Sequence, residues 1–220
     1  ASLVKNPEDT AQVFTVIDAL AGSAPARMFR RLLADPVGAR LLRERPDIVP
    51  VLSDRAALRA MPAGSLAHAY LAFVESEGIT ADGLVAASEE GGDPRHKDAP
   101  PEVEFMHLRM RDTHDLWHTV TGYQGDVLGE ASLLAFTLAQ TGNAGVGLMV
   151  LAGLHMAGAG GGREVIVDGF RRGCVAAWLP AQAWEELLAL PLAEVRRRLR
   201  LDDPPKYTPV RPTEYRAMTN

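Results

Sequence analysis

Apolar side chains recur along most of this chain every three or four residues, which is the spacing of an amphipathic helix. The pattern predicts helices over residues 7–22, 24–34, 36–45, 65–77, 102–120, 130–141, 144–159 and 163–178, with shorter ones starting at 180 and 191. Helix-start and helix-stop residues support several of these boundaries, such as the capping carboxylate before proline in Asp35-Pro36. No convincing strand is found. The sequence therefore predicts an all-α fold, a single-domain helical bundle over residues 1–220.

Two segments do not follow the helical pattern. Residues 80–101 are rich in glycine and proline and are expected to form a long loop, either a lid over a site or an ordinary surface loop. Residues 202–220 are rich in proline and are expected to form an extended tail that wraps the body or a neighbouring molecule.

The most apolar stretch is residues 144–159, where His155 is the one polar interruption. Its length is below the roughly 20 residues that a membrane-spanning helix needs, so we predict a buried central helix with His155 as a hydrogen-bonded core residue. The single cysteine, Cys174, is expected to be a small buried hydrophobe. In the helix predicted over residues 163–178, four side chains are predicted to face inward: Val167, Phe170, Cys174 and Val175.

The chemistry of the chain is concentrated at His114, Asp115, His118 and Glu130. On a helix, His118 lies about 40° and Asp115 about 100° from His114, so the three share one arc of the surface. After a glycine-containing bend, Glu130 opens the next helix and can face that arc if the two helices pack together. Side chains of these types suit a divalent metal. Two alternatives remain: a hydrogen-bonded surface cluster, and a Glu130 placed only to favour the helix dipole.

Charge and composition narrow the function further. The formal net charge of −5 argues against a nucleic-acid partner, which normally requires a basic surface. A lone cysteine excludes an internal disulfide and suits a reducing compartment. No signal or transit peptide pattern opens the sequence, so we expect a cytoplasmic bacterial protein.

The run from Arg109 to Gly122, closed by Gly129-Glu130, fits the pattern His-Asp-x-x-His, eleven residues, Glu. In this it resembles the signature of the fourth Coq protein of ubiquinone (coenzyme Q) biosynthesis. The resemblance covers essentially the whole chain. It also includes Asp35-Pro36-Val37-Gly38 with Glu44-Arg45-Pro46, the segment from Met61 to Ser65, and the segment from Glu185 to Leu199.

The resemblance implies a divalent metal, usually taken as zinc, and a polyprenylated aromatic substrate or another prenyl lipid. It implies loss of the ring carboxyl of a polyprenylated hydroxybenzoate coupled to hydroxylation of that ring carbon. The alternative function is a non-catalytic, polyprenyl-lipid-binding scaffold for other quinone-biosynthesis proteins. A homo-oligomer with peripheral contact to the inner face of the membrane is expected on the same grounds.

Several roles remain open on the sequence alone. Two histidines and a carboxylate also suit non-haem iron, so zinc and iron are both considered. Asp115 either binds the metal or orients a histidine. Arg109 or Arg111 either pairs with the substrate carboxylate or forms a salt bridge to Asp112 or Glu104.

A more distant hypothesis is a His-Asp phosphohydrolase, a helical enzyme class that binds metal through an adjacent His-Asp pair. It would need a further upstream histidine and a further downstream aspartate. His68 and Asp168 are the residues that could serve.

Overall fold

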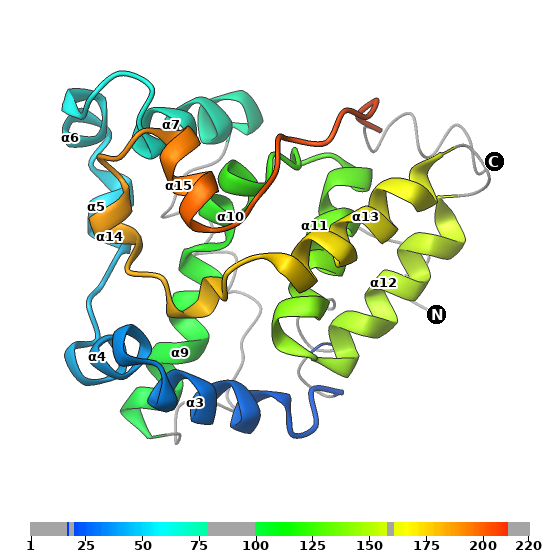
Figure 1. The fold of residues 1–220 in the computed structure, drawn as a ribbon, viewed down its shortest axis with the longest axis horizontal. Coiled ribbons are helices and arrows are strands. Elements are labelled where there is room, and N and C mark those ends of the chain that lie inside the picture. Colours follow the sequence, from blue (N-terminus) through cyan, green and yellow to red (C-terminus); the bar gives the residue numbers. More distant parts are fainter. Residues whose placement is uncertain (1–16, 18–19, 79–99, 158–160, 211–220) are drawn as a thin grey trace.

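The computed structural model of the protein describes residues 17, 20–78, 100–157 and 161–210, and within these ranges the regular elements are helical (Figure 1). The helices are α3 Ala24–Ala34, α4 Pro36–Glu44, α5 Val49–Ser53, α6 Arg55–Ala60, α7 Leu66–Glu77, α9 Pro101–Asp112, α10 His114–Thr121, α11 Val127–Thr141, α12 Ala144–Met156, α13 Gly162–Val175, α14 Trp184–Leu187 and α15 Leu192–Arg198, with the 3-10 turn η2 Leu179–Ala181. In these ranges β-type pairing is limited to one bridge between Ser65 and Pro191. The predicted all-α fold is confirmed for the described residues.

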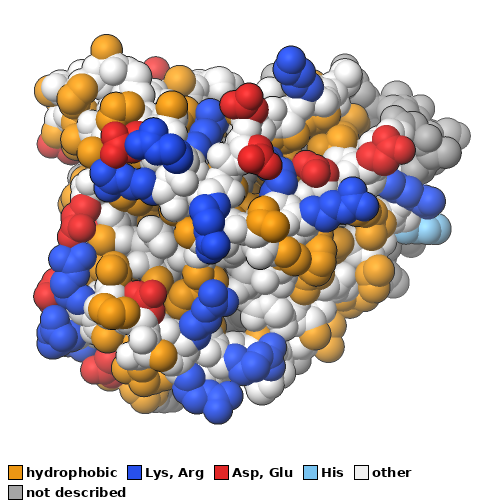
Figure 2. Space-filling view, viewed as in Figure 1, with side chains coloured by type: hydrophobic (Ala, Val, Ile, Leu, Met, Phe, Trp, Pro, Cys, Tyr) orange, Lys and Arg blue, Asp and Glu red, His pale blue; other side chains and the backbone are white. Residues whose placement is uncertain are grey.

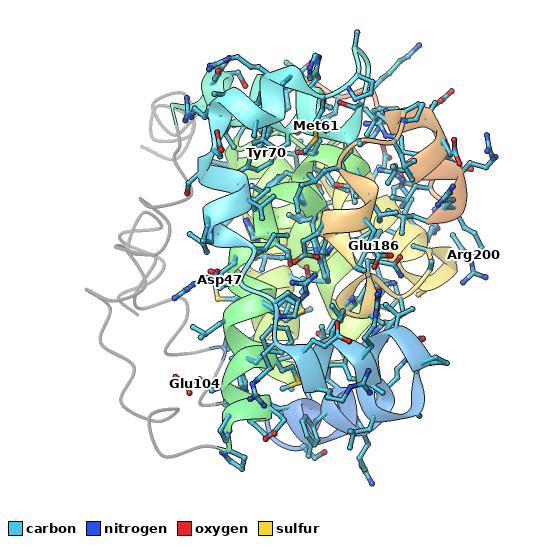
Figure 3. The ribbon with its side chains drawn as sticks, turned by 90° about the vertical axis from the view of Figure 1, so that its left-hand side faces the viewer. Asp47, Met61, Tyr70, Glu104, Glu186 and Arg200 are labelled. Carbon is cyan, nitrogen blue, oxygen red and sulfur yellow. The ribbon has the colours of Figure 1, made fainter. Side chains whose placement is uncertain are left out.

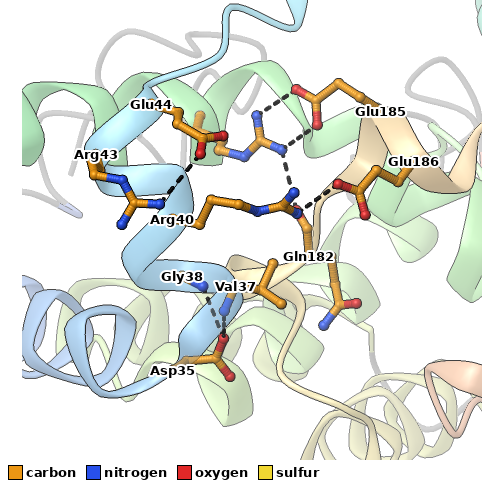
Figure 4. Close-up of polar contacts among 10 residues, drawn as sticks. Asp35, Val37, Gly38, Arg40, Arg43, Glu44, Gln182, Glu185 and Glu186 are labelled. Atoms are coloured by element: carbon orange, nitrogen blue, oxygen red, sulfur yellow. Dashed lines mark hydrogen bonds and ion pairs between the residues drawn. The ribbon is translucent and has the colours of Figure 1, made fainter.

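Short-range capping fixes several helix ends where the sequence predicts them. Asp35 Oδ1 accepts hydrogen bonds from the amides of Val37 and Gly38, both 2.9 Å long, and so starts α4 (Figure 4). The α7 helix begins after Ser65, whose hydroxyl accepts from the His68 amide, and it ends at Gly78 in the left-handed conformation, φ +68°.

The α10 helix lies at the centre of the molecule, between a layer formed by α11, α12 and α13 and a group that contains α5, α6, α7 and α15 (Figure 1). It packs mainly against α7 and α15. Seven of its eight residues are buried. Leu116, Trp117 and Val120 of α10 join the largest hydrophobic cluster, which also holds Tyr70 and Trp184. Of the candidate metal ligands on α10, His118 is therefore held in the packed core, whereas 40% of the His114 side chain is exposed.

The predicted helix over 102–120 is two helices. α9 ends at Asp112 and α10 begins at His114, separated by Thr113 with φ −96° and ψ 2°. The Thr113 hydroxyl donates to the Arg109 carbonyl at 2.7 Å and satisfies an acceptor at the end of α9. The break changes the direction of the chain just before the first histidine.

The predicted inward face of α13 is wrong. Gly169 and Gly173 lie against α11 so closely that added Cβ atoms would stand 2.3 Å from Ser132 O and 2.6 Å from Phe136 O. Ile166 and Arg172 are the other buried residues of α13. The contact with α11 leaves the side chains predicted to be buried on the surface instead: Val167, Phe170, Cys174 and Val175.

The α12 helix is also less buried than predicted. Its residues Leu148 and Leu151 are 47% and 64% exposed, and His155 is an exposed residue rather than a core histidine. Figure 2 shows hydrophobic side chains gathered on the surface over α12 and α13. α12 is therefore a surface helix, and no helix in the described ranges has the length and apolar character needed to cross a membrane.

The tail is extended where it is described, as predicted. Residues 202–210 run past the C-terminal end of α10 to the N-terminal end of α11 (Figure 1). There the Val127 amide donates to the Val210 carbonyl at 3.0 Å. Residues 211–220, and most of the predicted loop over 80–101, lie outside the described residues.

Candidate metal centre

The α10 helix presents His114 and His118 one turn apart on the same face. Their ring centroids are 4.7 Å apart in an edge-to-face arrangement. The His118 ring also stacks on Phe73 of α7, with centroids 5.0 Å apart, and the residue is only 1% exposed. Packing therefore fixes the orientation of the His118 ring.

Glu130 reaches the two histidines from the first turn of α11. The Asp126 side chain caps this helix by accepting from the Leu128 amide, and the Glu130 amide donates to the Asp126 carbonyl. Glu130 Oε1 lies 3.3 Å from His118 Nε2. One ligand atom each from His114, His118 and Glu130 falls within 4.8 Å of the others, which confirms the predicted convergence of the two helices.

The hydrogen bond on the far side of His118 determines what its ring can bind. His118 Nδ1 lies 3.0 Å from the Tyr123 carbonyl, and because a carbonyl only accepts, Nδ1 carries the proton in the neutral ring. Nε2 then holds a lone pair. This buried atom has no hydrogen-bond partner among the described residues, although it faces the Glu130 carboxylate. His118 is 1% exposed whereas the Glu130 side chain is 45% exposed, so the buried Nε2 is the atom that lacks a partner, and a proton or a cation between it and the carboxylate would satisfy it.

The spacing of these atoms fits a metal ion. Zinc bound to nitrogen and oxygen at about 2.0–2.1 Å in a tetrahedral arrangement separates neighbouring ligand atoms by about 3.3 Å. The observed distance of 3.3 Å between His118 Nε2 and Glu130 Oε1 matches that value. His114, with its ligand atom inside the same 4.8 Å group, can supply a third donor.

The electrostatics of the three side chains also favour positive charge at this point. Desolvation acts to raise the pKa of Glu130, but when the histidines are protonated the charge and hydrogen bond of His118 and the charge of His114 outweigh it and lower the pKa to about 2. Desolvation acts to lower the pKa of His114, but hydrogen bonding to Asp115 and the charge of Glu130 raise it overall. The acidic groups thus stabilise added positive charge, whether it comes from protons or from a metal.

Asp115 does not belong to this group of three. Its side chain is buried and its Oδ1 lies 3.5 Å from His114 Nδ1. This is the placement expected for the second predicted role of Asp115, in which the carboxylate orients a histidine. Nδ1 facing Asp115 leaves Nε2 of His114 as the free donor atom.

Comparison with known proteins identifies the family of this chain. Residues 1–205 match the family described as Coenzyme Q (ubiquinone) biosynthesis protein Coq4. The chain belongs to the Coq4 family. The resemblance inferred from the sequence motif is thereby confirmed.

Relatives of this Coq4 family member include proteins named mitochondrial ubiquinone biosynthesis protein COQ4. The one from Yarrowia lipolytica is 32% identical over 81% of this chain and 67% of its own length. The one from Clavispora lusitaniae is 28% identical over 91% of this chain, and the chain spans 62% of that relative's length. A crystal structure of a Nostoc punctiforme protein shares the fold, with a TM-score of 0.62 and 24% identity over 90% of this chain and 91% of that one.

The two arginines predicted to meet a substrate carboxylate already have acidic partners. Arg109 is 6% exposed, and its Nη1 and Nη2 donate to both Glu185 oxygens at 2.9 and 2.8 Å. Figure 4 shows Glu185 beside Gln182, whose carbonyl accepts a further bond from Arg109. The salt-bridge alternative is therefore the correct one for Arg109, but its partner is Glu185 rather than Asp112 or Glu104.

Arg111 forms the other predicted salt bridge. Its Nε donates to Asp112 Oδ1 at 2.6 Å, and both side chains are largely buried, with 15% and 9% of their surface exposed. Burial raises the pKa of Asp112, and the adjacent Arg111 only partly offsets this.

Some residues that the sequence analysis did not identify support the metal ligands through packing and hydrogen bonds. Tyr123 is 1% exposed and contributes its backbone carbonyl to His118. Phe73 fixes the ring of His118, and Asp126 caps the helix that carries Glu130. The Asp-containing start of α11 was a detectable signal for the cap, whereas nothing local in the sequence indicates Phe73.

The residues nominated for a phosphohydrolase are not brought to the metal group. His68 Nε2 lies 3.1 Å from the Arg59 carbonyl at the surface, and Asp168 is on α13. Among the described residues, the one group that could hold a metal is His114, His118 and Glu130.

A cavity of about 370 Å³ lies beside α9, separate from the three ligands. Its lining includes Arg45, Asp47, Glu104, Phe105 and Asp112. Figure 3 places Asp47 and Glu104 along one edge of the molecule, with Glu186 and Arg200 toward the other. Its wall also contains Arg109, so it carries side chains of both charges.

Proposed function

We propose that this Coq4 family member binds a divalent metal through His114, His118 and Glu130 and catalyses an oxidative decarboxylation in ubiquinone biosynthesis. Three protein ligands with a free coordination position are typical of catalytic rather than structural zinc sites. The observation that carries the proposal is the buried lone pair of His118 Nε2, held toward Glu130 by the hydrogen bond from Nδ1 to Tyr123. Zinc is our first choice of metal and iron the second, because both accept this donor set.

The proposed substrate is a polyprenylated hydroxybenzoate. In the balanced reaction, the bond between the ring and its carboxyl breaks, carbon dioxide leaves, and the ring carbon gains a hydroxyl group from water. Dioxygen, the oxidant, takes two electrons and two protons and becomes hydrogen peroxide. The metal, when bound, polarises oxygen atoms and stabilises developing negative charge.

The side chains around the metal have supporting roles in this proposal. Asp115 holds the His114 ring, and Phe73 with the Tyr123 carbonyl holds the His118 ring, so the donors are preorganised. Arg111 remains our candidate for pairing with the ring carboxylate, because its present partner, Asp112, is a neighbour whose pKa is raised. An R111A variant with unchanged turnover would remove Arg111 from this role.

The test begins with elemental analysis of protein purified without added metal. We expect about one equivalent of zinc or iron in the wild type and loss of it in H118A and E130Q. H155A is the matched control, because it removes an exposed histidine from α12. The purified proteins are then given a prenylated hydroxybenzoate and dioxygen, and release of carbon dioxide is measured. Metal-loaded wild type that releases none would refute the catalytic proposal.

The second candidate is a non-catalytic scaffold that binds prenyl lipids. The exposed apolar side chains of α12 and α13, such as Leu151 and Phe170, favour it because they offer apolar contact area at the surface. In this case the metal has a structural role, and H118A unfolds at lower temperature while no carbon dioxide is released by any variant. Assembly with itself, with other quinone-biosynthesis proteins and with a membrane surface is part of both proposals.

A further inference from the structure

We infer that residues 202–210, here called the strap, position the metal ligands, and that Tyr207 is the positioning residue through which they act. The inference rests on the proposed metal centre and adds a segment that is distant from it in sequence. The strap does not touch the metal position itself. It acts on residues 122–126, the loop that joins the helix of His118 to the helix of Glu130.

Asp126 is where the strap and the loop are tied together. This side chain is 6% exposed. Its Oδ1 accepts from the amides of Leu128 at 3.0 Å and Val210 at 2.8 Å. Its Oδ2 accepts from the Tyr207 hydroxyl at 2.7 Å. One carboxylate therefore caps α11 and binds the strap at two points.

The loop in turn contacts both ligand helices. At its start, the Tyr123 carbonyl accepts from His118 Nδ1 and sets the direction of Nε2. At its end, the Asp126 carbonyl accepts from the Glu130 amide at 2.8 Å. A displacement of this loop would therefore move a donor atom on each side of the proposed metal.

Tyr207 fixes the middle of the same loop. Its hydroxyl accepts from the Gln124 amide at 2.9 Å while it donates to Asp126. Its ring lies against that of Tyr123, with centroids 6.4 Å apart. One hydroxyl group thus joins the backbone of residue 124 to the buried Asp126 carboxylate.

Two glycines permit the strap to approach this closely. A Cβ atom at Gly122, where φ is +82°, would stand 2.5 Å from Pro204 Cβ. A Cβ atom at Gly129 would stand 2.6 Å from the Tyr207 hydroxyl. The strap therefore rests directly on backbone at both ends of the loop, where a small shift has no flexible side chain to absorb it.

The decisive variant is Y207F, which removes the hydroxyl and keeps the ring. Removing a group that orients metal ligands typically weakens metal binding by about 10–100-fold, and we expect about tenfold here. T208V is the matched control, because it removes a hydroxyl from the neighbouring, exposed strap residue. The wild type and both variants are titrated with Zn²⁺ against a chromophoric chelator. The absorption spectrum of the Co²⁺-loaded proteins reports the coordination geometry.

Melting temperatures measured with and without Zn²⁺ separate positioning from general stability. If Tyr207 positions the ligands, Y207F weakens Zn²⁺ binding, alters the Co²⁺ spectrum and reduces the increase in melting temperature that Zn²⁺ produces. If Tyr207 only stabilises the fold, Y207F melts earlier without metal, but its Zn²⁺ affinity and Co²⁺ spectrum equal those of T208V and the wild type. That result would overturn the inference and leave the metal centre intact. A wild type that binds neither ion would instead refute the metal centre itself.

Discussion

The ion pair between Arg109 and Glu185 gives the sharpest prediction of stability. Arg109 is 6% exposed, and both Glu185 oxygens accept from its guanidinium, while 25% of the Glu185 side chain remains exposed. The substitution E185Q keeps the size of the side chain and removes its charge. It leaves a buried guanidinium without a compensating negative charge from this partner.

The expected cost follows from the burial of the pair. Breaking a fully buried ion pair by removing one partner costs about 3–5 kcal/mol. The partial exposure of Glu185 and the remaining bond from Arg109 to the Gln182 carbonyl place E185Q near the lower end, at about 3 kcal/mol. With a urea m-value of about 2 kcal/mol/M, the midpoint of unfolding falls by about 1.5 M.

The neighbouring residue provides the control. Glu186 forms an ion pair with Arg40 at 2.6 Å, but 37% of the Arg40 side chain and 61% of the Glu186 side chain are exposed (Figure 4). Solvent screens an exposed pair, so E186Q is expected to lower the urea midpoint far less than E185Q does. Both unfolding curves are followed by far-UV circular dichroism.

Equal, small shifts for E185Q and E186Q would refute the assignment of Arg109 to a structural ion pair. Arg109 would then be available for a substrate carboxylate after all. In that case R109K would reduce turnover without reducing stability, and the sequence-based interpretation would replace the structural one.

The remaining predictions concern helix packing, the surface and acid stability. G169A is expected to destabilise the protein by about 1–3 kcal/mol in urea unfolding, since its Cβ would clash with Ser132 O, and a G169A variant as stable as the wild type would contradict the close crossing of α11 and α13. G147A, whose Cβ would make an ordinary 3.5 Å contact, is expected to stabilise the protein by up to about 1 kcal/mol. L151E should change the urea midpoint little, because Leu151 is 64% exposed; a large loss would mean that this side chain is covered. Although burial raises it, the protonated histidines lower the pKa of Glu130 to about 2, so the metal-free wild type should exceed E130Q in thermal stability above pH 4.5 while the adjacent imidazoles are protonated, and should lose that advantage as the pH falls toward 2; a difference independent of pH would contradict the pairing with the histidines.

Short-range signals in the sequence were sufficient for much of the fold. The Asp35-Pro36 cap and the Ser65 to Gly78 helix have boundaries that depend on residues within a few positions of one another. The same holds for the metal motif, because one helical turn places His118 beside His114. The short loop after this helix then brings Glu130 to face the two histidines.

Long-range packing decided what the sequence could not. The face of α13 was assigned by hydrophobicity, but the small size of Gly169 and Gly173 determined which side meets α11. The break at Thr113 could not be predicted, because no glycine or proline stands there to indicate the end of a helix. Arg109 was paired with nearby acids, whereas its partner Glu185 lies 76 residues away and becomes a neighbour only through the tertiary fold.

Arg196 is a similar case. Arginine side chains are mostly solvated, yet Arg196 of α15 donates to the carbonyls of Thr119 and Val120 at the end of α10. Burial and the charge of Arg172 lower the pKa of Arg196. The residue satisfies terminal carbonyls of the helix that carries both histidines.

Because the chain is synthesised from its N-terminus, the position of Tyr207 determines when its contacts with the loop can form. His114, His118 and Glu130 leave the ribosome almost together, but Tyr207 follows Asp126 by 81 residues. A nascent chain therefore carries all three side chains well before the contacts that hold their connecting loop can form. Final assembly of this centre therefore waits until the strap has been synthesised, and a chain halted before Tyr207 would contain every ligand without the contacts that hold their connecting loop.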